Sequence, residues 1–190
     1  MNTKAHVLTI TLPDWLQQRL AAPVQLHDDE SRMRLVIDLA RENITRGTGG
    51  PFAAAVFRAS DDMLVAAGVN SVTRLNNAML HAEVVALMFA QARVGSYSLR
   101  STGAPYELVT SCEPCAMCLG ATLWSGVQRL VCGATRDDAE RIGFDEGPVF
   151  AESYAYLERR GIAVVRQVLR AEAADVLNQY LHSGGIVYNG

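Results

Sequence analysis

Two short motifs restrict the folds that this chain can adopt. His-Ala-Glu at residues 81–83 begins a run with helical composition, and Pro-Cys-Ala-Met-Cys at residues 114–118 opens a second predicted helix. The imidazole of His81 and the thiols of Cys115 and Cys118 meet only in a fold where the N-termini of these two helices converge. The positive end of a helix dipole stabilises thiolates, so such a place suits a metal ion bound through sulfur.

The spacing of the two cysteines is that of a pair of metal ligands. Cys-x-x-Cys across the first turn of a helix lets both sulfur atoms reach one ion about 2.3 Å away. With His81 this makes three ligands and leaves a fourth tetrahedral position open for water, which Glu83 is close enough to reach without being a ligand. A redox pair would not need the His-Ala-Glu motif. A structural zinc site would need a fourth ligand, for which Cys112 is the only nearby candidate, and we assign Cys112 and Cys132 to the core.

Length, charge and hydropathy bound the class of protein. The 190 residues, of which 49% are hydrophobic and 19% charged, suffice for one globular domain. The formal net charge of -3 and the absence of a basic run argue against nucleic acid as a partner. No segment approaches the ~20 consecutive apolar residues of a transmembrane helix, so we expect no membrane association. Two of the four cysteines form the Cys-x-x-Cys pair, which favours metal chemistry in a reducing compartment and hence a cytoplasmic protein.

Alternating strands and helices predict an α/β fold. Residues 1–27 are interpreted as an N-terminal extension with one small helix, 28–182 as the domain that carries both motifs, and 183–190 as a C-terminal tail. Apolar runs predict strands at 52–59, 64–69, 108–110, 127–132 and 161–168. Helical patterns fall at 14–20, 28–47, 81–93, 115–124, 137–142 and 171–181. The alternation in the second half predicts a mixed sheet with parallel pairs, flanked by helices.

The signature His-x-Glu followed by Pro-Cys-x-x-Cys is that of zinc-dependent nucleobase deaminases. The chain resembles the cytidine and deoxycytidylate deaminase superfamily and, within it, the bacterial guanine deaminases. The resemblance extends from about residue 30 to the C-terminus and rests on Gly-Gly-Pro-Phe at 49–52, Asn70, residues 81–83, residues 113–124, and Gly-Phe-Asp-Glu-Gly-Pro at 143–148. It implies a three-layer α/β/α cytidine deaminase-like fold with a central mixed five-stranded sheet, one Zn²⁺ per subunit, and a homodimer.

The resemblance also implies catalytic roles, and 28–182 is then the catalytic domain. The imidazole and the two thiols would bind zinc, and Glu83 would take a proton from the water that zinc activates and pass it to a nitrogen of the substrate ring. In similar enzymes a second carboxylate in the Gly-Phe-Asp segment protonates the departing amine, and Glu146 is the matching position. Its neighbour Asp145 is assigned to substrate binding, with an exchange of these two roles left open. Without the resemblance, the two would be a solvated acidic pair before a Gly-Pro turn.

Further residues are expected around the substrate. Phe52 and Trp124 would offer flat surfaces to a purine ring, Asn70 would read the edge of the base with its amide, and Ala82 is assigned to the same site. The patterns alone would place these aromatics in the core and Asn70 in a strand-ending turn, and Trp124 fits a dimer interface equally well. In similar enzymes the C-terminal segment closes over the active site and is exchanged between subunits, so Tyr188 in the tail is expected to cap the substrate.

Together these residues favour hydrolytic deamination of guanine to xanthine and ammonia, in purine catabolism. Deamination of guanosine, cytosine or an aminotriazine such as ammeline would use the same attack and stays an alternative. A tRNA adenosine deaminase shares both motifs but is less favoured, because the predicted helix at 171–181 has no basic residue. Purely structural zinc in an interaction protein is disfavoured by Glu83, since a structural site gains nothing from a carboxylate beside an open coordination position. The expected partners are therefore a small nucleobase and a second copy of the chain.

Overall fold

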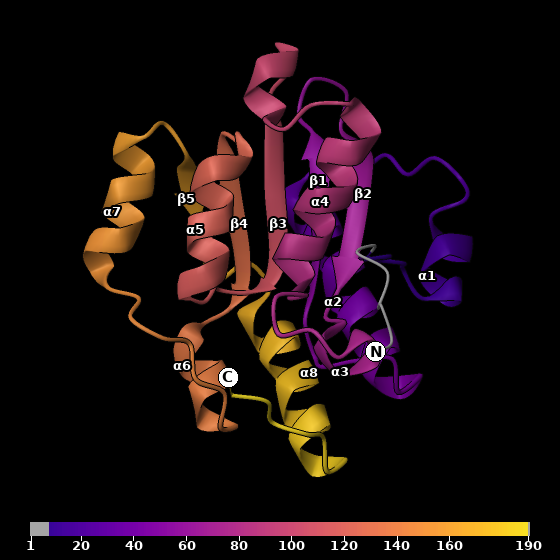
Figure 1. Cartoon of the computed structure of the whole chain (residues 1–190). Coiled ribbons are helices and arrows are strands. Elements are labelled where there is room, and N and C mark those ends of the chain that lie inside the picture. The colour runs from indigo at the N-terminus through magenta and orange to yellow at the C-terminus, as the bar shows by residue number, and fades with distance from the viewer. Residues whose placement is uncertain (1–7, 190) are drawn as a thin grey trace, which may run out of the picture.

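A five-stranded mixed sheet forms the centre of the molecule (Figure 1). The computed structural model describes residues 8–189, so the first seven residues of the predicted extension and Gly190 of the predicted tail lie outside it. In spatial order β2-β1-β3-β4-β5, the strands are β1 (Ala53–Arg58), β2 (Met63–Val69), β3 (Tyr106–Cys112), β4 (Arg129–Ala134) and β5 (Ala163–Val165). β1 is antiparallel to both of its neighbours, whereas β3, β4 and β5 are parallel. The predicted mixed sheet is confirmed.

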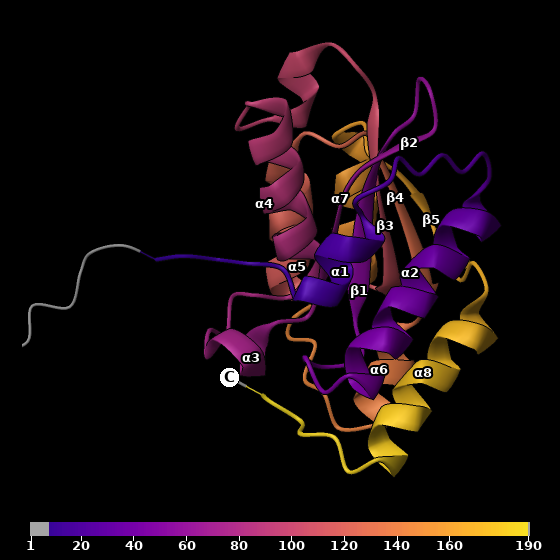
Figure 2. The same cartoon turned by 90° about the vertical axis from the view of Figure 1, so that its right-hand side faces the viewer.

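Helices cover both faces of the sheet and make the three layers visible in Figure 2. One face carries α2 (Asp29–Thr45) and α8 (Arg170–His182), and the other carries α4 (Ala82–Val94), α5 (Ala116–Ser125) and α7 (Ala151–Arg159). The buried apolar side chains form one cluster against each helical layer. Shorter helices are α1 (Asp14–Arg19), α3 (Val72–Leu75), α6 (Arg136–Arg141) and a 3-10 turn at Leu99–Thr102. The expected α/β/α fold is confirmed.

The structure differs from the sequence expectation in several elements. β3 begins at Tyr106 and ends at Cys112, beyond the predicted 108–110, because its polar residues are buried and hydrogen-bonded inside the sheet. β5 is shorter than the predicted 161–168. The helices α3 and α7 and the 3-10 turn were not predicted. Cys112 and Cys132 are buried, as expected for core thiols.

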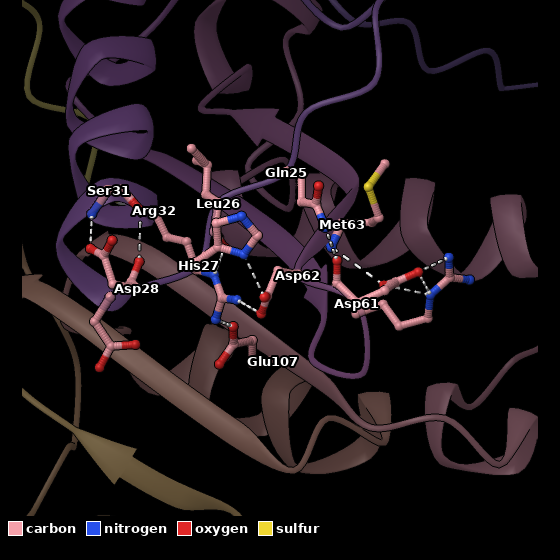
Figure 3. Close-up of polar contacts among 12 residues, drawn as sticks. Gln25, Leu26, His27, Asp28, Ser31, Arg32, Asp61, Asp62, Met63 and Glu107 are labelled. Atoms are coloured by element: carbon pink, nitrogen blue, oxygen red, sulfur yellow. Dashed lines mark hydrogen bonds and ion pairs between the residues drawn. The ribbon is translucent and has the colours of Figure 1, made fainter.

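A buried ionic cluster holds α2 against the sheet (Figure 3). Glu107 on β3 is 1% exposed and accepts hydrogen bonds from Arg32 of α2 and from Arg129 of β4, the latter at 2.7 Å. Arg32 also donates to Asp62 in the β1–β2 turn at 2.5 Å and to the carbonyl oxygen of Leu26 at 2.8 Å. A charged residue is therefore tolerated within a central strand because two guanidinium groups reach it.

Residues 12–27 pack against the rest of the chain. Trp15 and Leu16 of α1 are buried in the same core cluster as α2, and Gln25 forms an antiparallel bridge with Met63 at the start of β2. The indole nitrogen of Trp15 donates a hydrogen bond to Thr48. Within residues 8–189, each helix is too short or too polar to span a bilayer.

Candidate active site

The predicted metal ligands meet at the N-termini of α4 and α5. His81 is the N-cap of α4, Cys115 is the N-cap of α5, and Cys118 lies in the first turn of α5. The Nδ1 atom of His81 is 3.5 Å from the Sγ atom of Cys115 and 3.6 Å from that of Cys118. Tetrahedral zinc with Zn–S of about 2.3 Å and Zn–N of about 2.0 Å requires N···S separations of about 3.5 Å. The three ligand atoms therefore already have the spacing that a zinc ion needs.

The Cys115 thiol is prepared for metal binding by its surroundings. A hydrogen bond from Cys118 and a second one from His81 lower the pKa of Cys115 to about 4, so this ligand is a thiolate at neutral pH. His81, Cys115 and Cys118 are also the one group of three or more potential metal ligands that clusters within residues 8–189. Since the cluster supplies three ligands, the fourth tetrahedral position is left for water or substrate.

Two buried carboxylates flank the metal site. Glu83 in the first turn of α4 is 7% exposed, and burial raises its pKa. Glu146 is also 7% exposed, and burial, together with repulsion from the Cys115 thiolate, raises its pKa to about 8. Asp145 is instead exposed to solvent at the edge of the site, and its side chain accepts a hydrogen bond from the backbone N–H of Gly147 at 2.8 Å. The carboxylate poised beside the metal ligands is therefore that of Glu146.

The metal site opens into a small cavity. Its lining includes most of the predicted site residues and is formed by Phe52, Asn70, His81, Glu83, Cys112, Glu113, Cys115, Phe144, Asp145, Glu146 and Tyr188. The cavity has a volume of about 30 Å³. An apolar cavity of about 150 Å³ binds benzene, so the cavity in this conformation is much smaller than one known to hold a six-membered ring.

Asn70 presents a free donor to this cavity. Its Oδ1 atom accepts hydrogen bonds from the backbone N–H groups of Gly50 and Val72, each at 3.3 Å. The Nδ2 atom is buried and has no hydrogen-bond partner among residues 8–189. Because an unpaired buried donor is costly, this amide is placed to bind an acceptor on a ligand.

The C-terminal tail closes the cavity. The Tyr188 ring packs edge-on against Phe144, with ring centroids 5.1 Å apart, and Phe144 packs in the same way on Phe52 at 5.0 Å. The side chain of Asn189 donates to the carbonyl oxygen of Gly143 and accepts from the backbone N–H of Asp145, both at 2.9 Å. The tail is thus fastened to the same segment that carries Glu146.

Two predicted substrate contacts do not line the cavity. Ala82 is fully buried behind it at the start of α4, and Trp124 lies near the end of α5 with 74% of its surface exposed. Conversely, Cys112, Glu113 and Phe144 line the cavity without having been assigned to it. Phe144 lies inside the motif at 143–148, so the sequence could have predicted that Phe144 lies near the site.

The fold and the site define an α/β metalloenzyme with three protein ligands, an open coordination position and two buried carboxylates. Residues 26–134 match the family model of the cytidine and deoxycytidylate deaminase zinc-binding region, and the chain belongs to this family. It is a zinc-dependent hydrolytic deaminase.

Relatives of known structure and activity are similar over most of the chain. The guanine deaminase of Bacillus subtilis is 37% identical over 133 residues, which are 70% of this chain and 81% of the relative. A solved structure of the guanine deaminase from Nitrosomonas europaea is 46% identical with a TM-score of 0.89, covering 93% of this chain and 97% of that one. A solved structure of a mutant of the protein NE0047 in complex with 8-azaguanine is 45% identical with a TM-score of 0.91, covering 95% of this chain and 98% of that one.

Proposed function

We propose that this protein hydrolyses guanine to xanthine and ammonia, as an enzyme of purine catabolism. The observation that carries the proposal is the pair of buried carboxylates, Glu83 and Glu146, on a cavity that also holds the metal ligands and the unpaired amide of Asn70. Similarity to guanine deaminases and to a protein that binds 8-azaguanine supports guanine as the substrate.

The two carboxylates divide the proton transfers between them. When bound at His81, Cys115 and Cys118, zinc lowers the pKa of a water molecule so that hydroxide is available near neutral pH. Glu83 accepts the proton of the attacking water and passes it to a ring nitrogen, while oxygen adds to the amino-bearing carbon. Glu146, whose pKa is raised by burial, donates a proton to the departing amine, which leaves as ammonia. The hydroxyl proton that is lost when the new carbonyl group of xanthine forms returns to Glu146, so both carboxylates end in their starting states.

The remaining cavity residues bind and orient the base. The Nδ2 group of Asn70 donates a hydrogen bond to an acceptor on its edge, and Phe52 and Tyr188 bound the ring with their aromatic surfaces. Because the closed cavity is smaller than a purine ring needs, residues 183–189 act as a movable cap that opens for binding and release. A Cβ atom at Gly50 would overlap the hydroxyl of Tyr188, so glycine there is what lets the cap close fully.

We also propose that the enzyme is a homodimer. Trp124 on α5, Tyr156 on α7 and Met88 on α4 are 74%, 44% and 39% exposed, and their helices form one layer of the molecule. Leu119 and Leu123 line a hollow of about 400 Å³ between α5 and α7. Exposed apolar side chains that gather in this way mark interfaces. A second copy would cover them and bring the two tails close enough for exchange, and light scattering that gives a monomer at micromolar concentration would contradict this.

The cytoplasm is the compartment that fits the chemistry of the site. All four cysteines are free thiols, and two of them are metal ligands that oxidation to a disulfide would remove. A reducing compartment therefore preserves the metal site.

Ammonia release from a panel of bases and nucleosides tests the substrate. We expect the highest kcat/KM for guanine among guanine, guanosine, cytosine, cytidine, adenosine and ammeline. Strong activity on cytidine or on a tRNA anticodon stem with none on guanine would overturn the proposal.

Paired variants test the proton donor. Glu146→Gln should lower kcat about 10²- to 10⁴-fold with a smaller change in KM, because an amide has no acidic proton to donate. Asp145→Asn should lower kcat much less, since Asp145 is exposed and its carboxylate already accepts a hydrogen bond from Gly147. A larger loss of kcat in Asp145→Asn than in Glu146→Gln would instead identify Asp145 as the proton donor.

A further inference from the structure

A buried asparagine outside the cavity lies directly behind Asn70. Asn43 on α2 is fully buried, and its Nδ2 group donates to the carbonyl oxygens of Gly50 at 2.9 Å and of Asn70 at 3.0 Å. Its Oδ1 atom accepts a hydrogen bond from the hydroxyl of Thr48 at 2.7 Å. The amide of Asn43 therefore joins both backbone segments that surround the Asn70 side chain.

The hydrogen bonds continue outward to the N-terminal extension. The hydroxyl of Thr48, which donates to Asn43, accepts a hydrogen bond from the indole nitrogen of Trp15 at 3.1 Å. Trp15 lies on α1, is 8% exposed, and has the guanidinium of Arg46 over its ring at 5.8 Å. Trp15 donates to Thr48, and Thr48 donates to Asn43. Each of these hydrogen bonds fixes the orientation of the polar groups that it joins.

This chain of contacts determines where the Asn70 amide points. The backbone N–H of Asn70 donates to Phe52 at 2.9 Å, its carbonyl accepts from Asn43, and its Oδ1 accepts from Gly50 and Val72. With every other polar atom engaged, only Nδ2 faces the cavity. The fit is tight, because a Cβ atom added at position 49 would overlap the Asn70 carbonyl oxygen.

We propose that Asn43, together with Thr48 and Trp15, forms a positioning network. This network fixes the position and orientation of the Asn70 amide relative to the substrate, so that α1 takes part in substrate selection. The inference rests on the proposed function of Asn70 as a substrate contact. A displacement of about 1 Å in such a contact is enough to cost roughly 10²-fold in rate, so the exact position of the buried Nδ2 donor matters.

A double-mutant cycle separates positioning from simple stabilisation. Asn43→Ala would remove a donor from two buried carbonyl groups and endangers the fold, so Thr48 and Trp15 are changed instead. Thr48→Val removes the hydroxyl at nearly constant shape, whereas Trp15→Phe removes the indole N–H together with part of the buried ring. Each is made in the natural chain and in an Asn70→Ala background, and kcat/KM is measured on the substrate that the natural enzyme turns over fastest.

We expect each single variant to lower kcat/KM about tenfold in the natural chain and less than twofold when Asn70 is already alanine. The matched control is Thr45→Val, the same chemical change on the exposed side of α2, where the hydroxyl bonds only to the Arg41 carbonyl. This control should leave kcat/KM unchanged in both backgrounds.

Equal losses in both backgrounds, or no loss from either variant in a folded protein, would overturn the positioning network. Failure of guanine in the panel would instead overturn the proposed substrate, and the cycle would still be run on the base that is turned over. The two failures are therefore distinguishable.

Discussion

Replacing Glu107 by glutamine tests whether the buried ionic cluster stabilises the fold. The substitution keeps the shape of the side chain and removes the negative charge that faces Arg32 and Arg129. Breaking a buried ion pair by removing one partner costs about 3–5 kcal/mol. Arg32 keeps Asp62 and Arg129 keeps Asp29, each at 2.5 Å, so neither guanidinium loses its last carboxylate. We therefore expect a loss of about 3 kcal/mol in the free energy of unfolding.

Urea denaturation at neutral pH measures this loss directly, and for a chain of this size it corresponds to a melting temperature lower by roughly 6–12 °C. The control is Glu30→Gln, whose pair with Arg34 has side chains 62% and 55% exposed and should contribute less than about 0.5 kcal/mol. Glu107 lies about 16 Å along the extended strand β3 from Cys112 at the cavity, so zinc content and KM should not change. A loss below about 1 kcal/mol would refute the reasoning, because the buried pair would then contribute no more than an exposed one.

Three shorter predictions concern the metal, the proton transfer and acid stability. Cys115→Ala should lose zinc in elemental analysis and Cys112→Ala should retain it, since only the former offers a ligand atom to the cluster; the reverse result would remove the proposed ligand set. Glu83→Gln should keep zinc but lower turnover about 10²- to 10⁴-fold, and turnover within a few fold of the natural enzyme would exclude the proton shuttle. Hydrogen bonds from Arg170 hold the pKa of Asp138 well below its usual range, so its contribution to stability is complete at neutral pH and declines below about pH 4, where the unfolded chain takes up the proton first. The difference in unfolding free energy between the natural chain and Asp138→Asn should accordingly narrow as the pH falls toward about 3, and a constant difference would contradict this origin.

The metal ligands were predictable because their geometry is local. A proline followed by Cys-x-x-Cys sets a helix N-terminus, and the first turn of that helix brings Cys115 and Cys118 to one point. His81 likewise precedes its own helix. Only the convergence of the two helices depends on tertiary structure. The apolar strands that precede the helices were recognisable in the sequence, and they predicted the sheet that brings the helices together.

Trp124 shows where such reasoning ends. Helix α5 is apolar around most of its circumference, so its sequence does not reveal which face turns inward. The structure buries Cys118, Leu119, Thr122 and Ser125. At 3.6 residues per turn, Cys118, Thr122 and Ser125 lie within about 60° of one another, and Leu119 lies about 100° from Cys118 on the side away from Trp124. Trp124 lies about 120° from Cys118 on the same helix and is directed outward. Contacts between distant segments, such as that of Asn189 with Gly143, have no local signature at all.

The choice between Asp145 and Glu146 as the buried carboxylate was less predictable than the metal ligands and more predictable than the position of Trp124. In residues 144–147 burial alternates along the chain, with Phe144 and Glu146 inside and Asp145 and Gly147 outside. Where burial alternates in this way, a residue two positions from a large apolar side chain is buried on the same side of the segment as that side chain. Phe144 must be buried, and it therefore carries Glu146 into the cavity with it. The same burial raises the pKa of Glu146, so the apolar residue that directs this carboxylate inward also helps to keep it protonated.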